Sequence, residues 1–497
     1  MRTSVHPFSD VSLLRPEGEL LDVLRKGVDS MGGIARYVKP GDTVFIKPNL
    51  TAGMPASTGG TTDVLFTEAV VRLVKEAQPG RILVGECSGN ESRSIESLTN
   101  CGYVDMGRRQ GIEVVDLDFA EFEDISIEHP LYRDVVHLPK VLMEADVFIS
   151  VPVLKNHVSV GITVALKNSF GLVPDDDKLT AHRNNAVEEI LVDISKARRP
   201  DLVFVDGRLG AEGIAGGTHF KKPIAANLVL VGNDPVAIDA VSARVMDQNP
   251  RERYIQWAAM EGLGYDNLDY IRLHGLTIEE AKIHFLTPAE EIMQDSLGKV
   301  RLCDLESCSK CRATAEGAMS RFSATPASLL EPVDVVYGPG EWKKPSCINP
   351  RTLLLGDCIR EKYRALGHWI PGCPVDAEAY MKAMSDFNIV CTKCMDAAKA
   401  VMDGYTPEQL KDIRVLAANR TIFRGADNQA AVDDLLLAIG DCQAGYCRNH
   451  ARRGHKISDV DFDQTMVYQP GCPPTAEEIR SAFEEILRRA KERGPKA

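Results

Sequence analysis

The chain has 497 residues, which is too many for one ordinary hydrophobic core, so we expect two to four domains. Its 58 Lys and Arg residues against 71 Asp and Glu residues give a formal net charge of −13, which argues against a nucleic-acid-binding protein that neutralises phosphates. An acidic chain can still carry a local basic cleft for a small anionic substrate.

The first ten residues, MRTSVHPFSD, contain neither an apolar stretch nor a small-residue cleavage site, and no apolar run reaches the length of a membrane span. We therefore predict a cytoplasmic protein without a membrane span. In that compartment cysteines are expected as metal ligands or redox groups rather than as disulfides. Of the 13 cysteines, Cys87 and Cys101 precede residue 300, and the rest lie between Cys303 and Cys472.

The first 285 residues alternate strand-like and helix-like segments. Short apolar runs bounded by Gly, Pro, Asn or Asp predict strands at 42–50, 81–89, 112–118, 145–157, 201–208 and 226–234. Helical spacing of apolar residues predicts helices at 62–77 and 186–199. This alternation is typical of right-handed crossovers, so we expect an α/β domain with a mostly parallel sheet that helices cover on both faces.

Polar residues gather where these predicted strands end. Because open α/β sheets bind ligands outside the carboxyl ends of their strands, residues from distant parts of the chain are expected to meet in one crevice. The predicted substrate-binding residues are Lys47, Asn49, Glu86, Asn156, Asn168 and Asp206. The predicted catalytic residues are Lys155, Lys167, His157 and His182.

The lysines in this group are expected to hold an anion or to act as acid–base groups, and the histidines to carry protons. A single lysine is more often a solvated surface residue. Three lysines that are each followed by Asn or Pro-Asn, two of them directly after apolar strands, favour a functional cluster instead.

Several segments of this region carry a resemblance to a known family: VFIKPNL, VFISVPVLKNH, ALKNSFG, DLVFVDG and LVLVGNDPVAIDAV. They resemble the conserved blocks of domain of unknown function 362, over roughly residues 40–250, and this resemblance implies an iron–sulfur protein. Many members carry the run Cys-x-x-Cys-x-x-Cys-x-x-x-Cys-Pro, which this chain lacks. More distantly, the segments are similar to the nickel-pincer lactate racemase fold, whose metal-ligating histidines have no counterpart at matching positions.

A predicted linker near 285–300 is followed by an internal repeat. The first copy contains SCSKC, LLLGDC and IPGCP, and the second contains VCTKC, LAIGDC and QPGCPP. The matched cysteines are Cys308 and Cys391, Cys311 and Cys394, Cys358 and Cys442, and Cys373 and Cys472, with offsets of 83, 83, 84 and 99 residues. We infer a tandem duplication and predict three domains, at 1–285, 300–386 and 387–497.

Each copy provides four cysteines, the number that a [4Fe–4S] cluster or a tetrahedral zinc ion needs. Structural zinc usually takes two Cys-x-x-Cys-type pairs, whereas each copy has one such pair and two solitary cysteines. Each solitary cysteine lies between a predicted strand and a helix-forming run, where backbone N–H groups favour a negatively charged thiolate-ligated cluster. We predict two [4Fe–4S] clusters as cofactors, with zinc or unmetallated thiols as alternatives.

The order of these motifs resembles the proximal-cluster site in the small subunit of nickel–iron hydrogenases and the related cluster subunit of respiratory complex I. The resemblance implies ligand roles for the eight paired cysteines and two related smaller α/β lobes with a flavodoxin-like fold. Cys303, Cys347 and Cys447 have no counterpart in the other copy, so structural or surface thiols are the simpler interpretation. Core packing is expected for Cys101, while Cys87 follows Glu86 at a strand end and could line the crevice.

Together these features predict an iron–sulfur oxidoreductase that acts on a small anionic metabolite, a carboxylate or a phosphorylated compound, with a ferredoxin-like or other redox partner. Two alternatives stay open. One is a non-redox lyase or isomerase in which a cluster iron acts as a Lewis acid, which needs an iron with only three protein ligands. The other is a non-catalytic electron-transfer protein whose N-terminal domain is a docking module.

Overall fold

A computed structural model of the protein describes residues 8–89, 93–215, 222–323, 330–342, 348–387, 389, 393–410, 413–417, 420–423, 435–440 and 466–493. The chain divides into two compact units. The first unit comprises Met1–Glu291 with Cys308–Ala313, and the second comprises Ile292–Ser307 with Thr314–Ala497. This division does not test where one repeat gives way to the next, so the predicted repeat boundaries stay predictions.

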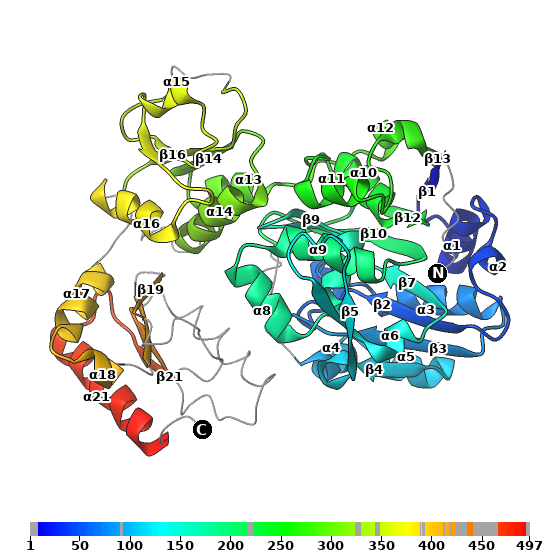
Figure 1. Ribbon diagram of the computed structural model, residues 1–497, viewed down its shortest axis with the longest axis horizontal. Coiled ribbons are helices and arrows are strands. Elements are labelled where there is room, and N and C mark those ends of the chain that lie inside the picture. Colours follow the sequence, from blue (N-terminus) through cyan, green and yellow to red (C-terminus); the bar gives the residue numbers. More distant parts are fainter. Residues whose placement is uncertain are drawn as a thin grey trace. The chain divides into compact units, whose positions relative to one another are not determined.

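The first unit is built on one large sheet (Figure 1). Its strands, in spatial order, are β13 (Ile271–Gly275), β1 (Ser9–Leu14), β12 (Leu228–Gly232), β10 (Leu202–Glu212), β7 (Val147–Val151), β2 (Thr43–Pro48), β3 (Arg81–Glu86) and β4 (Glu113–Asp116). Neighbouring strands are parallel from β10 to β4, whereas β12 runs antiparallel to both β1 and β10. The predicted α/β class with a mostly parallel sheet is confirmed.

Shorter strands extend this sheet. They are β8 (Val153–His157) and β11 (Lys222–Ile224), which pair with β10, and β9 (Gly161–Thr163), which pairs with β8. A separate hairpin consists of β5 (Phe122–Ser126) and β6 (Val135–Pro139). The run 145–157, predicted as one strand, is divided into β7 and β8 at Pro152, because proline has no N–H to donate to the ladder.

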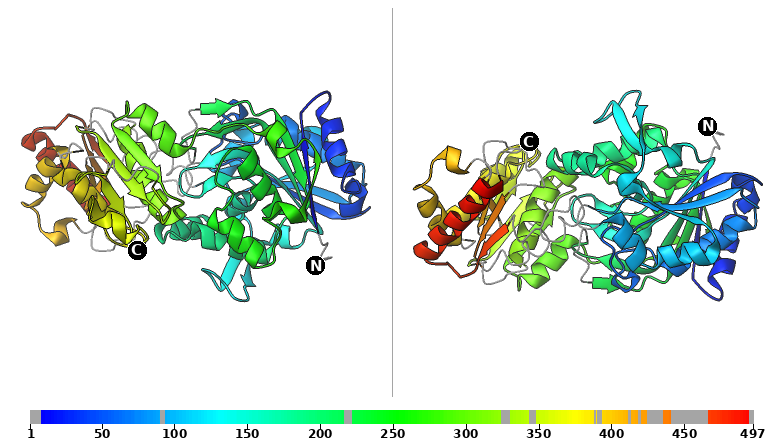
Figure 2. Two further views of the ribbon diagram at one scale, coloured as in Figure 1. Left: turned by 90° about the horizontal axis from the view of Figure 1, so that it is seen from above. Right: turned by 90° about the horizontal axis from the view of Figure 1, so that it is seen from below.

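Helices cover both faces of the large sheet, as predicted. In β2, Val44 and Ile46 belong to one hydrophobic cluster and Phe45 to another, because successive side chains of a strand point to opposite faces. Residues of α1 (Leu20–Asp29), α3 (Val64–Lys75) and α5 (Tyr103–Gln110) complete the first cluster. Residues of α9 (Val187–Ala197), α10 (Pro235–Val245) and α11 (Arg253–Met260) complete the second. Figure 2 shows helices of this unit, coloured blue to green, on both sides of the sheet.

The remaining helices of the first unit are short. They are α2 (Ile34–Tyr37), α4 (Ser94–Asn100), α6 (Lys140–Met143), α7 (Ala165–Asn168), α8 (Asp175–Arg183) and α12 (Ile278–Ala281), with 3-10 turns η1 (Ala56–Thr58), η2 (Leu117–Phe119), η3 (Ser169–Leu172) and η4 (Leu268–Tyr270). The predicted linker contains the helix α13 (Pro288–Asp295).

The strand β1 is absent from the expectations drawn from sequence, and its polar residues explain why. Ser9 and Ser12 interrupt the apolar pattern, yet both are buried. Ser9 Oγ donates to Asp234, and Ser12 Oγ donates to Gly27 O at 2.8 Å. A buried strand can hold such residues when partners from distant elements satisfy them, which a local pattern does not reveal.

The second unit contains two smaller sheets, in which all described strands but one are parallel to their neighbours. The first has the spatial order β14 (Val300–Asp304), β15 (Val333–Tyr337), β16 (Leu353–Leu355) and β17 (His368–Ile370). The second has the order β19 (Arg420–Phe423), β18 (Ile413–Ala417), β20 (Leu435–Ile439) and β21 (Met466–Gln469), with β19 antiparallel. The first sheet follows chain order, so it differs from the flavodoxin-like strand order expected for it. The helices are α14 (Ser309–Ser323), which begins in the first unit, and α15 (Glu361–Arg364), α16 (Ala377–Asp386), α17 (Lys393–Met402), α18 (Pro407–Leu410) and α21 (Ala476–Arg493).

The two sheets repeat one arrangement of strands and turns. In the first, Gly356 N–H donates to Ile370 O at 2.9 Å; in the second, Gly440 N–H donates to Gln469 O at 2.8 Å. These bonds join the start of each Gly-Asp-Cys motif to the strand before each Pro-Gly-Cys-Pro turn. The Cys–Pro peptide bond of that turn is cis in both copies. The repeat seen in the sequence is therefore also present in the backbone.

Candidate functional site

The carboxyl ends of β2 and β3 carry a buried ion pair. Lys47 Nζ lies 2.7 Å from Glu86 Oε1, and the two side chains are 1% and 3% exposed. Lys47 Nζ also donates to Pro48 O at 2.9 Å and to Asn168 Oδ1 at 3.3 Å. Burial lowers the pKa of Lys47, and the charge of Glu86 opposes this effect. The pair is a charge-neutral part of the site.

Lys155, in the middle of β8, is surrounded by hydrogen-bond acceptors. Its Nζ donates to Asn49 Oδ1 at 2.8 Å, Thr51 Oγ1 at 2.9 Å and Gly60 O at 2.8 Å. Thr51 Oγ1 gives its own proton to Asn49 Oδ1 at 3.1 Å, so it accepts from the lysine. Burial and then the charge of Lys167 lower the pKa of Lys155. Three acceptors nevertheless require three N–H donors, which only the ammonium form has, so we infer that Lys155 is a fixed cation.

The short helix α7 positions Lys167 and Asn168. The N–H groups of Ala165 and Leu166 donate to the two carboxyl oxygens of Asp239 at 2.6 and 3.2 Å. At the other end, Asn168 Nδ2 donates to Lys47 O at 3.2 Å, and Asn168 Oδ1 accepts from Asn49 at 3.1 Å. Burial raises the pKa of Asp239 to about 8, against the effect of the two N–H donors. The helix is thereby held at both ends.

Lys167 differs from these lysines in its surroundings. Its side chain is 9% exposed, and its Nζ lies 4.1 Å from the centre of the Phe170 ring. Among the described residues, no hydrogen bond or ion pair reaches this ammonium group, and an aromatic face only partly stabilises a cation. Burial, together with the charges of Lys178 and Lys47, lowers the pKa of Lys167 to about 7. Ammonium and amine forms therefore coexist near neutral pH.

His157 lies in the same electrostatic environment. Its Nδ1 accepts from the N–H groups of Ser159 at 3.1 Å and Val160 at 3.4 Å. Burial lowers the pKa of His157 well below its usual value, and the charges of Lys167, His182 and Lys155 add to the effect. The ring is therefore neutral near pH 7, with its proton on Nε2.

His182, on α8, is exposed and packs edge-on against Phe170, with ring centres 5.5 Å apart. The Phe170 ring thus contacts both the Lys167 ammonium group and the His182 ring. The structure brings together the four residues predicted to be catalytic, Lys155, Lys167, His157 and His182, and four of the predicted ligand residues, Lys47, Asn49, Glu86 and Asn168. Their roles stay predictions.

The other two predicted ligand residues point to other partners. Asn156 follows Lys155 on β8, so the pleat directs it to the opposite face, where Nδ2 donates to Leu286 O at 3.0 Å. Asp206 forms a two-bond ion pair with Arg208, whose Nε and Nη2 both lie 2.9 Å from carboxyl oxygens of Asp206. Their positions favour structural roles.

Two residues that were not predicted for the site adjoin it, Lys178 and Gly171. Lys178, on α8, is buried, and its Nζ lies 2.8 Å from Cys87 Sγ, 2.9 Å from Ser88 O and 3.2 Å from Asp175 Oδ1. Burial works to lower the pKa of Lys178, but Cys87 and Asp175 outweigh it and the pKa is raised. The only local signal was Asp175 three residues earlier, which on a helix usually means a surface ion pair.

A glycine completes the enclosure of the ion pair. A Cβ added to Gly171 would lie 2.6 Å from Glu86 Oε1 and 2.7 Å from Lys47 Nζ. The φ of Gly171 is −76°, so glycine is needed here for space and not for its backbone freedom. The glycine that ends the segment ALKNSFG was therefore an available signal.

The cysteines of the first copy lie on two parts of the chain. Cys308 precedes α14 and Cys311 is buried in its first turn, within the segment that belongs to the first unit. Arg312 Nη1, in the same segment, lies 2.8 Å from Glu252 Oε1, and both side chains are buried. The segment is thus anchored in the first unit.

The two solitary cysteines of the first copy lie in adjoining turns of the second unit. Asp357 N–H donates to Gly372 O at 3.1 Å, and Gly372 N–H donates to Asp357 Oδ1 at 3.0 Å. Cys358 and Cys373, which follow these residues, are both exposed. Each lies between a strand and a helix, as predicted. The convergence of all four cysteines stays a prediction.

In the second copy, Cys394 lies beside the turn that carries Cys472. Cys394 is buried near the start of α17, and its Sγ lies 4.0 Å from the carbonyl oxygen of Gly471, which precedes the exposed Cys472. Cys391 and Cys442 lie outside the described residues. Within the described parts of the chain, no three His, Cys, Asp or Glu side chains are close enough to hold a metal ion together.

The remaining cysteines are of mixed character. Cys303 is half-buried on β14, and Cys347 and Cys447 lie outside the described residues. Cys101 donates to Met54 O at 3.3 Å, and burial raises its pKa to about 11, which is typical of an inert structural thiol.

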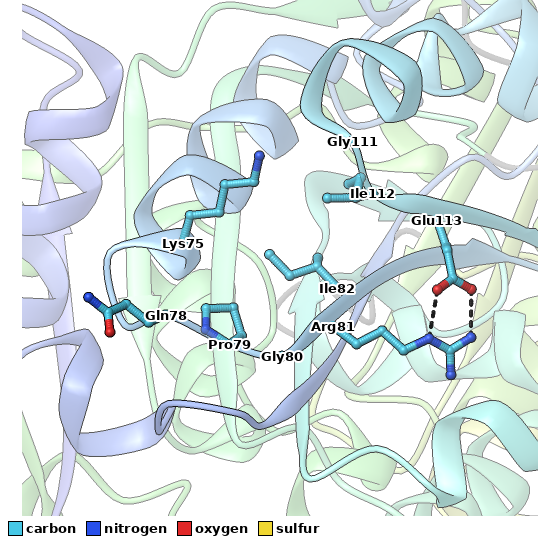
Figure 3. A pocket seen from close by; sticks show the side chains of 9 residues that line it. All are labelled: Lys75, Gln78, Pro79, Gly80, Arg81, Ile82, Gly111, Ile112 and Glu113. Atoms are coloured by element: carbon cyan, nitrogen blue, oxygen red, sulfur yellow. Dashed lines mark hydrogen bonds and ion pairs between the residues drawn. The ribbon is translucent and has the colours of Figure 1, made fainter.

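Surface pockets occur at the opposite edges of the sheets. One of about 280 Å³ lies at the amino ends of β3 and β4, where Arg81 pairs with Glu113 (Figure 3). Another of about 340 Å³ lies at the amino ends of β14, β15 and β16. Neither includes a residue of the lysine group, by which we mean the buried residues Lys47, Lys155, Lys167 and Lys178. Of the helices in the described ranges, none is both long and apolar enough to span a membrane.

Comparison with known proteins places this geometry in a family. Residues 44–244 match a family model described as Domain of unknown function (DUF362). The thylakoid-associated protein sll1697 of Synechocystis sp. is 32% identical over 266 residues, which cover 51% of this chain and 79% of that protein.

Two solved structures show a weaker likeness. The lactate racemase apoprotein from Thermoanaerobacterium thermosaccharolyticum is 13% identical with a TM-score of 0.29, over 40% of this chain and 50% of that one. A crystal structure of a Thermotoga maritima protein is 12% identical with a TM-score of 0.32, over 50% of this chain and 60% of that one. The matched segments thus span only about half of the first structure and 60% of the second.

The family match covers β2 to α10, the region that carries the lysine group. It confirms the resemblance seen in the segments from VFIKPNL to LVLVGNDPVAIDAV, whereas the hydrogenase-like resemblance of the repeat stays a prediction. The chain belongs to the DUF362 family.

Proposed function

We propose that the protein is an iron–sulfur oxidoreductase whose first unit binds a small anionic metabolite at the lysine group. The observation that carries this proposal is the surroundings of Lys167. A nearly buried ammonium that lacks a carboxylate partner among the described residues, within reach of the charges of Lys47 and Lys178, is unfavourable on its own. A bound carboxylate or phosphate would supply the missing negative charge.

The same group offers acid–base chemistry to that ligand. Lys167 titrates near pH 7 and can accept a proton there, while the neutral ring of His157 presents an N–H donor. Lys167 would then exchange the proton, as amine and ammonium in turn, and the neutral His157 ring would donate a hydrogen bond to a ligand oxygen. Lys155 adds a fixed positive charge that orients the anion.

The cysteine sets support a place for two [4Fe–4S] clusters. The turns of Cys358 and Cys373 adjoin, and Cys394 lies beside the turn of Cys472. Backbone N–H groups at such strand–helix corners suit thiolates that ligate a cluster. When bound, a cluster supplies one-electron transfer, and the residues of the first unit would hold the substrate and move its protons.

Anion binding is the direct test. Isothermal titration with oxalate and with inorganic phosphate should give an affinity that falls at least about tenfold in Lys167→Met and in Lys155→Met, because each change removes a buried charge contact. Lys26→Met, which removes an exposed lysine of α1, is the matched control and should bind as the unaltered protein does. Equal affinities in all four proteins would exclude the lysine group as the anion site.

A lyase or isomerase is the second candidate, because uptake and release of a proton by Lys167 serves proton transfer without electron transfer. A turnover assay with and without an electron acceptor distinguishes the two functions. Conversion of substrate without any acceptor would favour the second candidate.

A further inference from the structure

We propose that the Lys167 amine forms an imine with its substrate, so that the metabolite is a small carbonyl compound with an anionic group, such as a 2-oxo acid. This inference rests on the proposed anion site and adds the substrate class and a covalent step.

The four buried lysines of the first unit separate into two kinds. Lys47, Lys155 and Lys178 each have at least three acceptors around Nζ, so all their N–H groups are engaged and no lone pair is available. Lys167 has an aromatic ring beside its Nζ and no acceptor among the described residues. A nucleophile needs a free lone pair, which in this group only Lys167 can present.

The charges around Lys167 favour its neutral form. A lysine buried beside other cations is a known route to a reactive amine, because desolvation and like charge both disfavour the ammonium. The titratable side chains whose charges act together with that of Lys167 are Lys47, Lys178, Lys155 and His157, and the exposed His182 contacts the same Phe170 ring. The carboxyl group of Asp239, a residue of α10, lies at the start of α7 and is engaged by the backbone N–H groups of that helix.

Among the described residues, two buried hydroxyl groups adjacent to residues of the site, one across a strand pair and one along the chain, are unsatisfied. Thr163 Oγ1 and Ser169 Oγ have no hydrogen-bond partner in the described part of the chain. Thr163 is paired across β8 and β9 with Lys155, and Ser169 directly follows Asn168 at the end of α7. An unsatisfied buried hydroxyl costs about 1 to 3 kcal/mol, which a ligand oxygen would offset.

The chemical step balances without an oxidant. The Lys167 lone pair attacks the carbonyl carbon, and the carbonyl π bond opens to a hydroxyl group. The C–O bond then breaks, and the oxygen leaves as water with the two hydrogens of the amine. The product is a C=N bond, and the ligand's anionic group stays free to pair with the surrounding cations.

Reductive trapping tests the proposal on the full-length protein. The protein is treated anaerobically with glyoxylate or pyruvate and cyanoborohydride near pH 7, digested, and analysed by peptide mass spectrometry. The reduced adduct should appear on Lys167 at least about tenfold faster than on exposed Lys26 in the same digest, because a far larger fraction of Lys167 is neutral. Lys167→Arg, which keeps the charge, should lose this adduct and keep the slow one on Lys26.

Oxalate separates this proposal from the proposed function, because it is an anion without an electrophilic carbonyl. If oxalate raises the melting temperature while Lys167 is labelled no faster than Lys26, the imine is wrong and the anion site stands. If oxalate has no effect and Lys167 is not labelled, both are wrong. The labelling of the unaltered protein decides the matter even if the variant does not fold.

Discussion

Four lysines are buried in the described part of the first unit, and the number of acceptors around each nitrogen distinguishes them. Lys47 and Lys178 have carboxylate partners, in Glu86 and Asp175. Lys155 is held by neutral oxygens. Lys167 has only a ring beside it, so its protonation state depends on pH in the physiological range.

The protonation of Lys167 predicts a pH-dependent effect on stability. Its pKa is about 7 in the folded protein and about 10.4 in an unfolded chain, so the unfolded state binds more protons between these values. The contribution of Lys167 to the free energy of unfolding therefore rises with pH across this window, and its destabilising effect is complete below it. Lys167→Met should raise the free energy of unfolding by about 4 kcal/mol more near pH 6 than near pH 10.

Urea unfolding followed by circular dichroism at the two pH values measures this difference. Lys26→Met is the control, since that side chain is exposed, and its effect should not change with pH. A Lys167→Met effect of the same size at both pH values would show that Lys167 is an ordinary solvated cation.

At the scale of elements, α7 shows how a short helix can carry two functional side chains. Only four residues long, it cannot be stable through its own hydrogen bonds. Asp239 engages its first two N–H groups, and Asn168 ties its last residue to β2. The position of Lys167 therefore depends on α10, which contributes Asp239 from far along the chain.

Removal of the Asp239 carboxyl group should displace this helix. Asp239→Ala leaves two buried N–H groups without an acceptor, so we expect a loss of about 1 to 3 kcal/mol in the free energy of unfolding, and weaker oxalate binding. Asp239→Asn keeps one acceptor and should be intermediate. Thermal unfolding and isothermal titration measure the two effects.

Asp376→Ala is the matched control for that change. Asp376 caps α16 in the second unit by accepting from Ala379 N–H at 2.8 Å, and it is exposed. Its loss should cost about 1 kcal/mol and leave oxalate binding unchanged. If Asp239→Ala behaved in the same way, the carboxyl group would be a simple cap without influence on the site.

The elements were largely predictable from the sequence, whereas the contacts within the site were only partly so. Apolar runs such as 42–50 predict buried strands because the parallel sheet is covered on both faces, and the ends of those strands locate Lys47 and Lys155. Lys178 could not be found in this way, because its partners just after β3 are far away in sequence and its own helix starts with three aspartates. Asn156 adjoins Lys155 in sequence but lies on the other face of β8, because the pleat separates them, and its predicted binding role stays a prediction.

At the scale of the whole molecule, the chain combines a DUF362 region with a duplicated cysteine-bearing unit. The family match ends at residue 244, and every cysteine of the repeat lies beyond it. The relative at 32% identity matches over 266 residues, so its likeness concerns about half of the chain. The chemistry of the second half therefore has to be tested on this protein itself.

Metal content provides that test. Anaerobically purified protein should contain about eight iron and eight labile sulfide per chain. Cys373→Ser and Cys472→Ser, which each remove one ligand from a different copy, should each lower both counts by about half. Cys303→Ser removes a cysteine without a counterpart in the other copy and should leave them unchanged. Tightly bound zinc without labile sulfide would contradict the assignment of both cofactors.

The mutual hydrogen bonds between Asp357 and Gly372 have a consequence for biogenesis. They join the two solitary-cysteine turns of the first copy through protein atoms alone. In the second copy, the bond from Gly440 to Gln469 is the counterpart of the bond from Gly356 to Ile370. Cofactor delivery would then be an event after folding, in which a donor loads a chain whose receiving turns are already apposed. Such a chain could lose its inorganic cargo under oxidative damage and be refilled without passing through the unfolded state.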